Sequence, residues 1–204
     1  MAKLTFNALE INEMKRVYAA GHKEWDSIEV ETLKPKIKAY KEEIQDSKCC
    51  YCDRSSLGEA RMVLDIEHII PKSKKIKHMF TLKNLAMSCR RCNFKKKDRV
   101  EFLSCSVDEL PKRLFRSKYY MIIHPNLDEY NNHLEKICLS LGGMDLIKYK
   151  IINSSLKGRY TYSFFCLEEF EKDSFNTAQG KKVNMIKNPE IARMYNYLIE
   201  SCKQ

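Results

Sequence analysis

The feature that most constrains this chain is a repeated pair of cysteines. Cys49 and Cys52 form one pair and Cys89 and Cys92 the other, so the frame reads C-x2-C, 36 residues, C-x2-C. Each pair can place both sulfurs on one metal ion, and two pairs complete a tetrahedral site of four thiolates. Zinc is the expected metal. Iron uses the same four sulfurs, so the spacing leaves that alternative open.

The remaining cysteines do not extend this pattern. The chain has nine, an odd number, and no secretory leader is visible at its start, which favours thiols over disulfides. Cys50 is expected to point away from the metal. The others are expected to be buried or idle thiols: Cys105, Cys138, Cys166 and Cys202. A thioredoxin-like dithiol is not expected, because the pairs are duplicated and lack a βαβ context.

Composition indicates an ordered protein. The 204 residues are 44% hydrophobic and 31% charged, enough for a proper core. No run of about 18 apolar residues is present, and the first residues are already amphipathic and charged. We therefore expect a soluble, cytoplasmic protein with no membrane partner.

The net charge of +10 is concentrated in one segment. Residues 72–99 hold eleven Lys or Arg against one acid, Asp98, and the rest of the chain is neutral. Such an excess is typical of a surface that binds nucleic acid. For residues 72–77 taken alone, a solvated lysine-rich loop is the alternative. The candidate contacts are Lys72, Lys74, Lys75, Arg90, Arg91, Lys95, Lys96 and Lys97.

Between the cysteine pairs lie residues suited to phosphodiester hydrolysis. His68 can take a proton from water, since an unperturbed histidine titrates near neutral pH. A divalent cation would bind oxygen ligands, for which Glu67 and Asn93 are candidates. Neighbours on a strand point to opposite faces, so Glu67 and His68 converge only if the strand ends there, as Pro71 suggests. Asn84 is expected to fix the loop around His68.

The predicted fold is α+β: a mainly helical protein around a ββα-metal core that the four cysteines staple with zinc. Residues 1–48 are expected to form two helices, the first capped by Asn7 and ended by Gly21, with His22 a surface histidine after it. Residues 49–99 form the core, with strands at 62–69 and 82–88 and a helix at 90–97.

Residues 100–204 are expected to complete the same globular unit with helices and a hairpin. Helices are predicted at 107–116 and from Pro125 to near Leu141, where Gly142 and Gly143 stop the second. Strands at 146–153 and 160–167 would form the hairpin. A last helix begins with Asn188 as its cap and Pro189 in its first position. Tyr119–Tyr120 and the aromatics of 160–165 are expected in the core, with a docking surface as the alternative.

Taken together, the motifs resemble the HNH endonuclease family, also called ββα-metal or His-Me nucleases. The resemblance covers about 50 residues: the two cysteine pairs, Glu67-His68-Ile69-Ile70-Pro71-Lys72-Ser73, Asn84-Leu85, Asn93 and Lys97-Asp98. More closely, Cys50-Tyr51-Cys52, Ile66-Glu67-His68 and Pro71-Lys72-Ser73 resemble the HNH proteins encoded beside retrons and in Septu-type antiphage systems.

The resemblance implies a role for each motif residue. His68 would be the general base, Glu67 and Asn93 the ligands of a catalytic Mg²⁺ or Mn²⁺, and Asn84 the residue that orients the loop. The four cysteines match the family's zinc ligands. Glu67 stands where most of the family has Asp, and Asn93 replaces the last His. A bacterial cytoplasmic setting and an ABC- or SMC-like ATPase partner are also implied.

Three functions remain open at this point. The first is a metal-dependent endonuclease on DNA, the nuclease effector of an antiphage complex, with little sequence preference because no reader module is evident. The second is the same site acting on RNA such as tRNA. The third is a catalytically silent zinc-finger module that binds nucleic acid or a partner. A pure binder has no need of Glu67, His68 and Asn93 in register.

Overall fold

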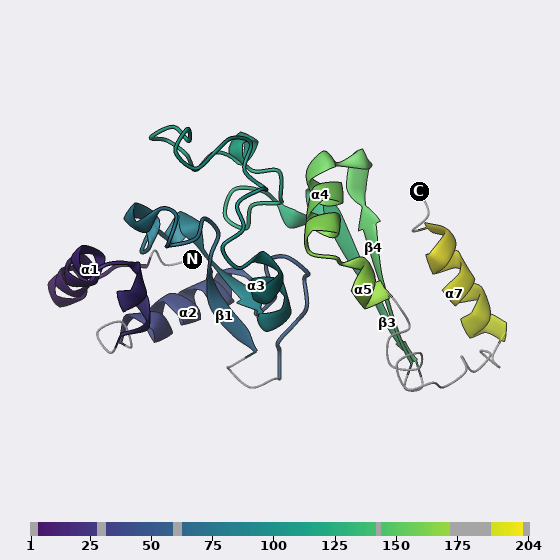
Figure 1. Ribbon diagram of the computed structural model, residues 1–204. Coiled ribbons are helices and arrows are strands. Elements are labelled where there is room, and N and C mark those ends of the chain that lie inside the picture. Colours follow the sequence, from purple (N-terminus) through teal and green to yellow (C-terminus); the bar gives the residue numbers. More distant parts are fainter. Residues whose placement is uncertain (1–3, 28–31, 59–62, 142–143, 172–188, 202–204) are drawn as a thin grey trace. The chain divides into compact units, whose positions relative to one another are not determined.

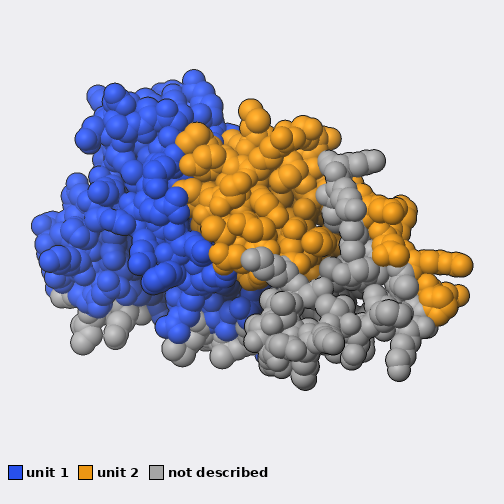
Figure 2. All heavy atoms as spheres, turned by 45° about the vertical axis from the view of Figure 1, so that its right-hand side comes forward, with its two compact units in different colours: residues 1–120, 124–128 blue, residues 121–123, 129–204 orange. Residues whose placement is uncertain are grey.

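The computed structural model describes residues 4–27, 32–58, 63–141, 144–171 and 189–201 (Figure 1). The chain divides into two compact units, coloured in Figure 2. Unit 1 comprises residues 1–120 and 124–128, and unit 2 comprises residues 121–123 and 129–204. The sequence-based ranges 1–48, 49–99 and 100–204 remain a prediction. In the part of the chain just described, no helix has the length and apolar character needed to cross a membrane.

Unit 1 begins with helices whose ends follow the sequence signals. Helix α1 (Ala8–Ala20) starts with the expected capping box: Asn7 Oδ1 accepts from the Glu10 N–H, and the Glu10 carboxylate accepts from the Asn7 N–H. It ends at Gly21, whose φ of 116° suits glycine. A short 3-10 helix η1 (His22–Asp26) follows, and then α2 (Leu33–Ile44), with Pro35 in its first turn.

The centre of unit 1 is a two-stranded antiparallel sheet followed by a short helix. Strand β1 (Leu64–His68) pairs with β2 (Leu85–Cys89) from Leu64↔Cys89 to His68↔Leu85. Helix α3 (Arg90–Lys96) follows directly and packs on both strands (Figure 1). This is the predicted ββα order. The strands are shorter than predicted because 82–84 form a 3-10 turn, η4 (Leu82–Asn84), and residue 62 lies outside the described residues.

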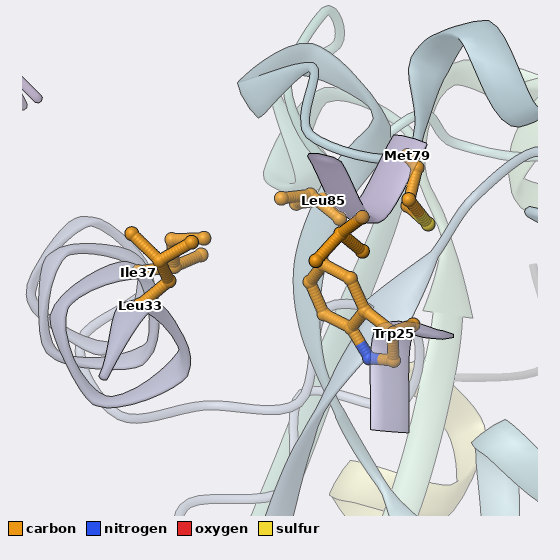
Figure 3. Packing of buried hydrophobic residues seen from close by; sticks show 6 residues of the cluster. Trp25, Leu33, Ile37, Met79 and Leu85 are labelled. Atoms are coloured by element: carbon orange, nitrogen blue, oxygen red, sulfur yellow. The ribbon is translucent and has the colours of Figure 1, made fainter. Parts of the chain in front are cut away.

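The core beside this sheet is apolar and comes from separate segments. Leu33 and Ile37 lie on one side of α2, and Trp25, Met79 and Leu85 gather close to one another (Figure 3). Each of these five side chains is at most 5% exposed. Full burial of side chains of this size contributes about 1.5–3 kcal/mol each. The core therefore fixes η1 and the loop before η4 against the sheet.

The described loops of unit 1 add short 3-10 turns: η3 (Ile76–His78) and η5 (Ser117–Tyr119). The helix predicted at 107–116 is wrong. The start of this segment does have cap-like bonds: the N–H and the hydroxyl of Ser106 both donate to Glu109 Oε2. However, Pro111 has no N–H to continue a helix, and the segment forms successive turns that bury Leu110 and Leu114.

Unit 2 is built on the hairpin of β3 (Leu134–Leu141) and β4 (Met144–Ile151), paired from Leu134↔Ile151 to Leu141↔Met144. Its described helices and 3-10 turns are η6 (Tyr130–Asn132), η7 (Ile152–Ser154), α4 (Leu156–Phe164), α5 (Glu168–Glu171) and α7 (Pro189–Ser201). The last helix is the predicted one, with Pro189 as its first residue. Its predicted cap, Asn188, and the predicted stop at Gly142 and Gly143 lie outside the described residues.

Two predictions in unit 2 are wrong. The helix predicted to end near Leu141 is strand β3, because cross-strand pairing with β4 decides a segment whose apolar pattern fits either state. The strand predicted at 160–167 is α4, capped by Ser155, whose hydroxyl accepts from the Gly158 N–H. Gly158 suits this helix because a Cβ there would clash with the carbonyl oxygen of His133.

Three residues of the two aromatic segments lie in the cores of their own units, and Tyr119, Tyr160 and Tyr162 are half-buried. Tyr120 in unit 1 and Phe164 and Phe165 in unit 2 are each at most 7% exposed. Core packing, the leading interpretation for these three residues, is therefore what the structure has.

Candidate active site

The zinc end of the β1–β2 sheet is formed by the cysteine pairs. Cys49 and Cys52 lie in a tight turn after α2, where the Cys49 N–H donates to the Arg54 carbonyl, and Cys50 N–H donates to the Met87 carbonyl of β2. Cys89 ends β2, and Cys92 lies on α3. The four sulfurs are buried and lie within 4.8 Å of one another.

This arrangement fits a tetrahedral ion. A metal with bonds of about 2.3 Å to sulfur holds its ligand atoms about 3.8 Å apart. The Sγ atoms of Cys52 and Cys89 are 3.8 Å apart. Each of the predicted ligands is present, so these four cysteines could hold a structural zinc ion.

At the opposite end of the same sheet, the predicted catalytic residues meet in a pocket of about 540 Å³. Glu67 and His68 are the last two residues of β1, and Asn93 lies one turn into α3. All three line the pocket. The alternation along β1 does not keep Glu67 and His68 apart, because the strand ends at His68 and the pocket lies around that end.

His68 is held as a neutral base. Its Nε2 lies 3.1 Å from the Met79 carbonyl oxygen, which can only accept, so Nε2 carries the proton and Nδ1 keeps its lone pair. The edge of Trp25 contacts its ring, with centroids 4.5 Å apart and planes at 80°. Burial, aided by Lys72 and Lys96, lowers the pKa of His68 to about 3, against the hydrogen bond to Met79. The imidazole therefore stays unprotonated at neutral pH.

Asn84 fixes the loop that follows His68. Its Oδ1 accepts from the Ile70 N–H at 2.8 Å, and its Nδ2 donates to the carbonyls of Ile70 and His78 at 3.0 and 3.1 Å. The side chain is completely buried. These three bonds bring the loop back toward β2 and so place Met79, the partner of His68. Asn84 does not line the pocket, and its contacts match the loop-fixing role expected for it.

Glu67 is buried beside a lysine. Its carboxylate Oε1 forms an ion pair with the Lys96 ammonium, and the two side chains are 5% and 0% exposed. Burial raises the pKa of Glu67, and the charge of Lys96 opposes that shift. The carboxylate has a second oxygen for a cation, and Asn93 offers an amide oxygen across the pocket. These two residues would hold the catalytic cation, with water or phosphate oxygens filling the other positions.

The basic residues predicted to bind nucleic acid separate into three groups. Lys72 and Lys97 line the pocket. Lys74 and Arg90 are exposed, and Arg91 and Lys95 are partly exposed. The other two are engaged inside the protein: Lys75 Nζ donates to the Val107 carbonyl at 2.7 Å, and Lys96 is fully buried. For Lys96 the prediction of a surface phosphate contact is wrong, because its charge lies beneath the surface.

Other pocket residues were not recognised from the sequence. Lys34 and Lys38, one turn apart on α2, line the pocket, as does His22, which was expected to be an ordinary surface histidine. Trp25 also lines it. The signal available for Trp25 was that it is the one tryptophan of the chain. For the lysines no signal existed, because nothing local shows that α2 faces the end of β1.

Comparison with known proteins agrees with this geometry. The family model described as HNH endonuclease matches residues 49–99, which run from the first cysteine of the frame to three residues past the end of α3. Residues 49–99 are an HNH endonuclease region. This region contains the cysteine frame, both sheet strands and the three pocket residues.

The chain is also similar to a protein of the Septu system. It is 32% identical over 113 residues to the Septu protein PtuB of Bacillus thuringiensis. The match covers 55% of this chain and 37% of the relative, so the chain spans well under half of that protein's length. No solved structure matches. The HNH match supports nuclease activity in general, and the Septu similarity extends over just over half of this chain.

Proposed function

We propose that this protein is a metal-dependent endonuclease that hydrolyses phosphodiester bonds of DNA. The observation that carries the proposal is the state of His68. It is a neutral imidazole with Nδ1 unprotonated, in one pocket with Glu67 and Asn93. A binding module has no use for a buried base beside two oxygen ligands.

Each residue has a defined task in this proposal. The His68 Nδ1 accepts a proton from the attacking water, while Met79 and Trp25 keep the ring in place. Glu67 and Asn93 hold the divalent cation. When bound, Mg²⁺ or Mn²⁺ supplies positive charge for the phosphoryl oxygens and the leaving oxygen. Lys72 and Lys97, at the wall of the pocket, attract the phosphate backbone.

The proposal extends to a setting. Similarity to a Septu protein supports a role as the nuclease effector of an antiphage complex. The partner we propose is an ABC- or SMC-like ATPase encoded beside it. We propose DNA as the substrate, with RNA as the alternative that the assay below tests; the lysines that line the pocket supply positive charge for the phosphate backbone of either.

The decisive experiment is a cleavage assay on supercoiled plasmid and on total tRNA, with Mg²⁺, Mn²⁺ or EDTA. We expect His68→Ala to lower the rate about 10²- to 10⁴-fold, because the general base is lost. His78→Ala is the matched control. His78 lies on the same loop and does not line the pocket. It should cleave at a rate close to that of the wild type.

Each arm has a clear reading. Equal cleavage by wild type and His68→Ala would refute the catalytic assignment. Cleavage of tRNA alone would replace DNA by RNA as the substrate. Binding of DNA without cleavage, with and without the co-purified ATPase, would favour the zinc-finger module.

A further inference from the structure

Lys96 is the one buried cation of α3 among the residues described. Its ammonium contacts Glu67 Oε1, donates to the His68 carbonyl at 2.8 Å and reaches the Lys97 carbonyl at 3.3 Å. It also lies 5.8 Å from the ring centre of Phe102. The Lys96 side chain is completely buried, so its charge acts inside the protein.

Stability alone gives little reason for such a pair. Burying two charges costs free energy that their attraction offsets only when the geometry is good. Well-packed apolar residues of similar volume are often at least as stable. A buried pair therefore needs another explanation, and its position beside the proposed catalytic groups provides one.

The contacts of Lys96 join the two elements that carry the site. Glu67 and His68 come from β1, and Lys96 holds the side chain of one and the backbone of the other. Asn93 lies three residues before Lys96 on the same short helix. Residues three apart on a helix share a face. One side chain thus sets the distance between the proposed cation ligands Glu67 and Asn93.

We propose that Lys96 is a positioning residue of the site, an internal cation that holds the Glu67 carboxylate in place and fixes α3 against the end of β1. This inference rests on the proposed nuclease function. Lys96 does not touch nucleic acid. Its loss should weaken binding of the divalent cation and leave the electrostatic contact with DNA unchanged.

The test compares Lys96→Met with Lys97→Met, a substitution at the residue directly after the end of α3. Lys97 is exposed and lines the pocket. Three properties of the full chain are measured: Mn²⁺ binding by calorimetry, the salt dependence of DNA binding without added divalent cation, and kcat and KM for plasmid cleavage. Zinc content and circular dichroism check that each variant is folded.

For Lys96→Met we expect Mn²⁺ affinity and kcat to fall about 10- to 100-fold, as for partners that orient metal ligands. KM and the salt slope should stay at the wild-type values. For Lys97→Met we expect the salt slope to decrease by about 1, because a phosphate contact is lost. Lys96→Arg keeps the charge and should recover part of the Mn²⁺ affinity.

Two results overturn the proposal: wild-type Mn²⁺ affinity in folded Lys96→Met, or a salt slope reduced as in Lys97→Met. If Lys96→Met does not fold, Lys96→Arg is measured in its place. A reduced salt slope of DNA binding in Lys96→Arg overturns the proposal. If the wild type cleaves no nucleic acid, the nuclease proposal fails, while Mn²⁺ binding and the salt slope still test the role of Lys96.

Discussion

The two ends of the β1–β2 sheet are stabilised by different kinds of interaction. At the Leu64↔Cys89 end, four buried sulfurs gather within 4.8 Å, an arrangement suited to a metal ion. At the His68↔Leu85 end, hydrogen bonds between polar groups and one buried ion pair stabilise the structure. The first end has the ligands for an ion, and the second is held by protein contacts beside a pocket.

The difference shows how a very small sheet supports chemistry. Five-residue strands in a two-stranded sheet are marginal by themselves. A metal at one end lets the other end carry buried charge, which is costly for stability. Substitutions at the two ends should therefore have different effects. At the zinc end they should cause loss of structure, and at the pocket end they should displace the proposed catalytic groups.

The largest expected effect is at the zinc end. Cys89→Ser should lose the metal and unfold the HNH region, because structural zinc contributes about 10–16 kcal/mol and domains are stable by only about 5–15 kcal/mol. Elemental analysis and thermal unfolding monitored by circular dichroism measure this. Cys138→Ser, at an exposed cysteine of unit 2, is the control and should keep its zinc. An unchanged melting temperature after loss of zinc would show that the metal is not structural.

A smaller effect is expected from the loop at the pocket end. Asn84→Ala removes three hydrogen bonds and leaves the Ile70 N–H unsatisfied. We expect a loss of about 2–3 kcal/mol of stability with zinc retained. Cleavage should fall about tenfold or more, since the carbonyl that orients His68 is on this loop. Asn132→Ala, at an exposed position of unit 2, should change neither property. Full cleavage activity in folded Asn84→Ala would show that this loop does not orient His68.

The last effect depends on pH and concerns Lys41 of α2. Its Nζ donates to Asn126 Oδ1, and Asn126 Nδ2 donates to the Leu85 carbonyl at the pocket end of β2. Burial lowers the pKa of Lys41 to about 8 from an ordinary value of 10.5. Between these values the folded lysine has lost its proton while the unfolded one keeps it. The unfolded state therefore binds more protons, and stability rises with pH through this window.

Urea unfolding of the wild type and Lys41→Met between pH 7 and 10.5 measures this contribution. The midpoint of the wild type should rise relative to that of the variant as the pH increases above about 8. A constant difference between the two midpoints at every pH would contradict the expectation.

Sequence was sufficient where the signal is local. The capping box at Asn7, the stop at Gly21 and the cysteine frame each depend on neighbours along the chain, and the structure has the first two as predicted. The ββα order followed from the same kind of pattern. Residues 134–141 were assigned to the wrong state because their strand exists only through pairing with β4. The other two errors each involve one residue. Pro111 excludes the helix that was predicted around it, and Gly158 allows a helix where a strand was predicted.

The candidate site divides in the same way. His68, Glu67, Asn84 and Asn93 were named from their order, and three of them line one pocket. Trp25, Lys34 and Lys38 were missed because they approach from segments distant in the chain. Lys96 was misassigned because charge counting does not reveal burial. The three adjacent lysines 95–97 look alike in sequence, and only packing places Lys96 inside.

The shortness of α3 has a consequence for the response to oxidants. Its seven residues are too few for a stable helix by themselves, and they carry the metal-spaced Cys92 together with Asn93 and Lys96. Thiolates oxidised to sulfenic acid or to disulfides no longer hold zinc in this geometry. Oxidation at the far end of the sheet would therefore release the helix that completes the pocket, and the hydrolytic site would depend on the cell's thiol balance.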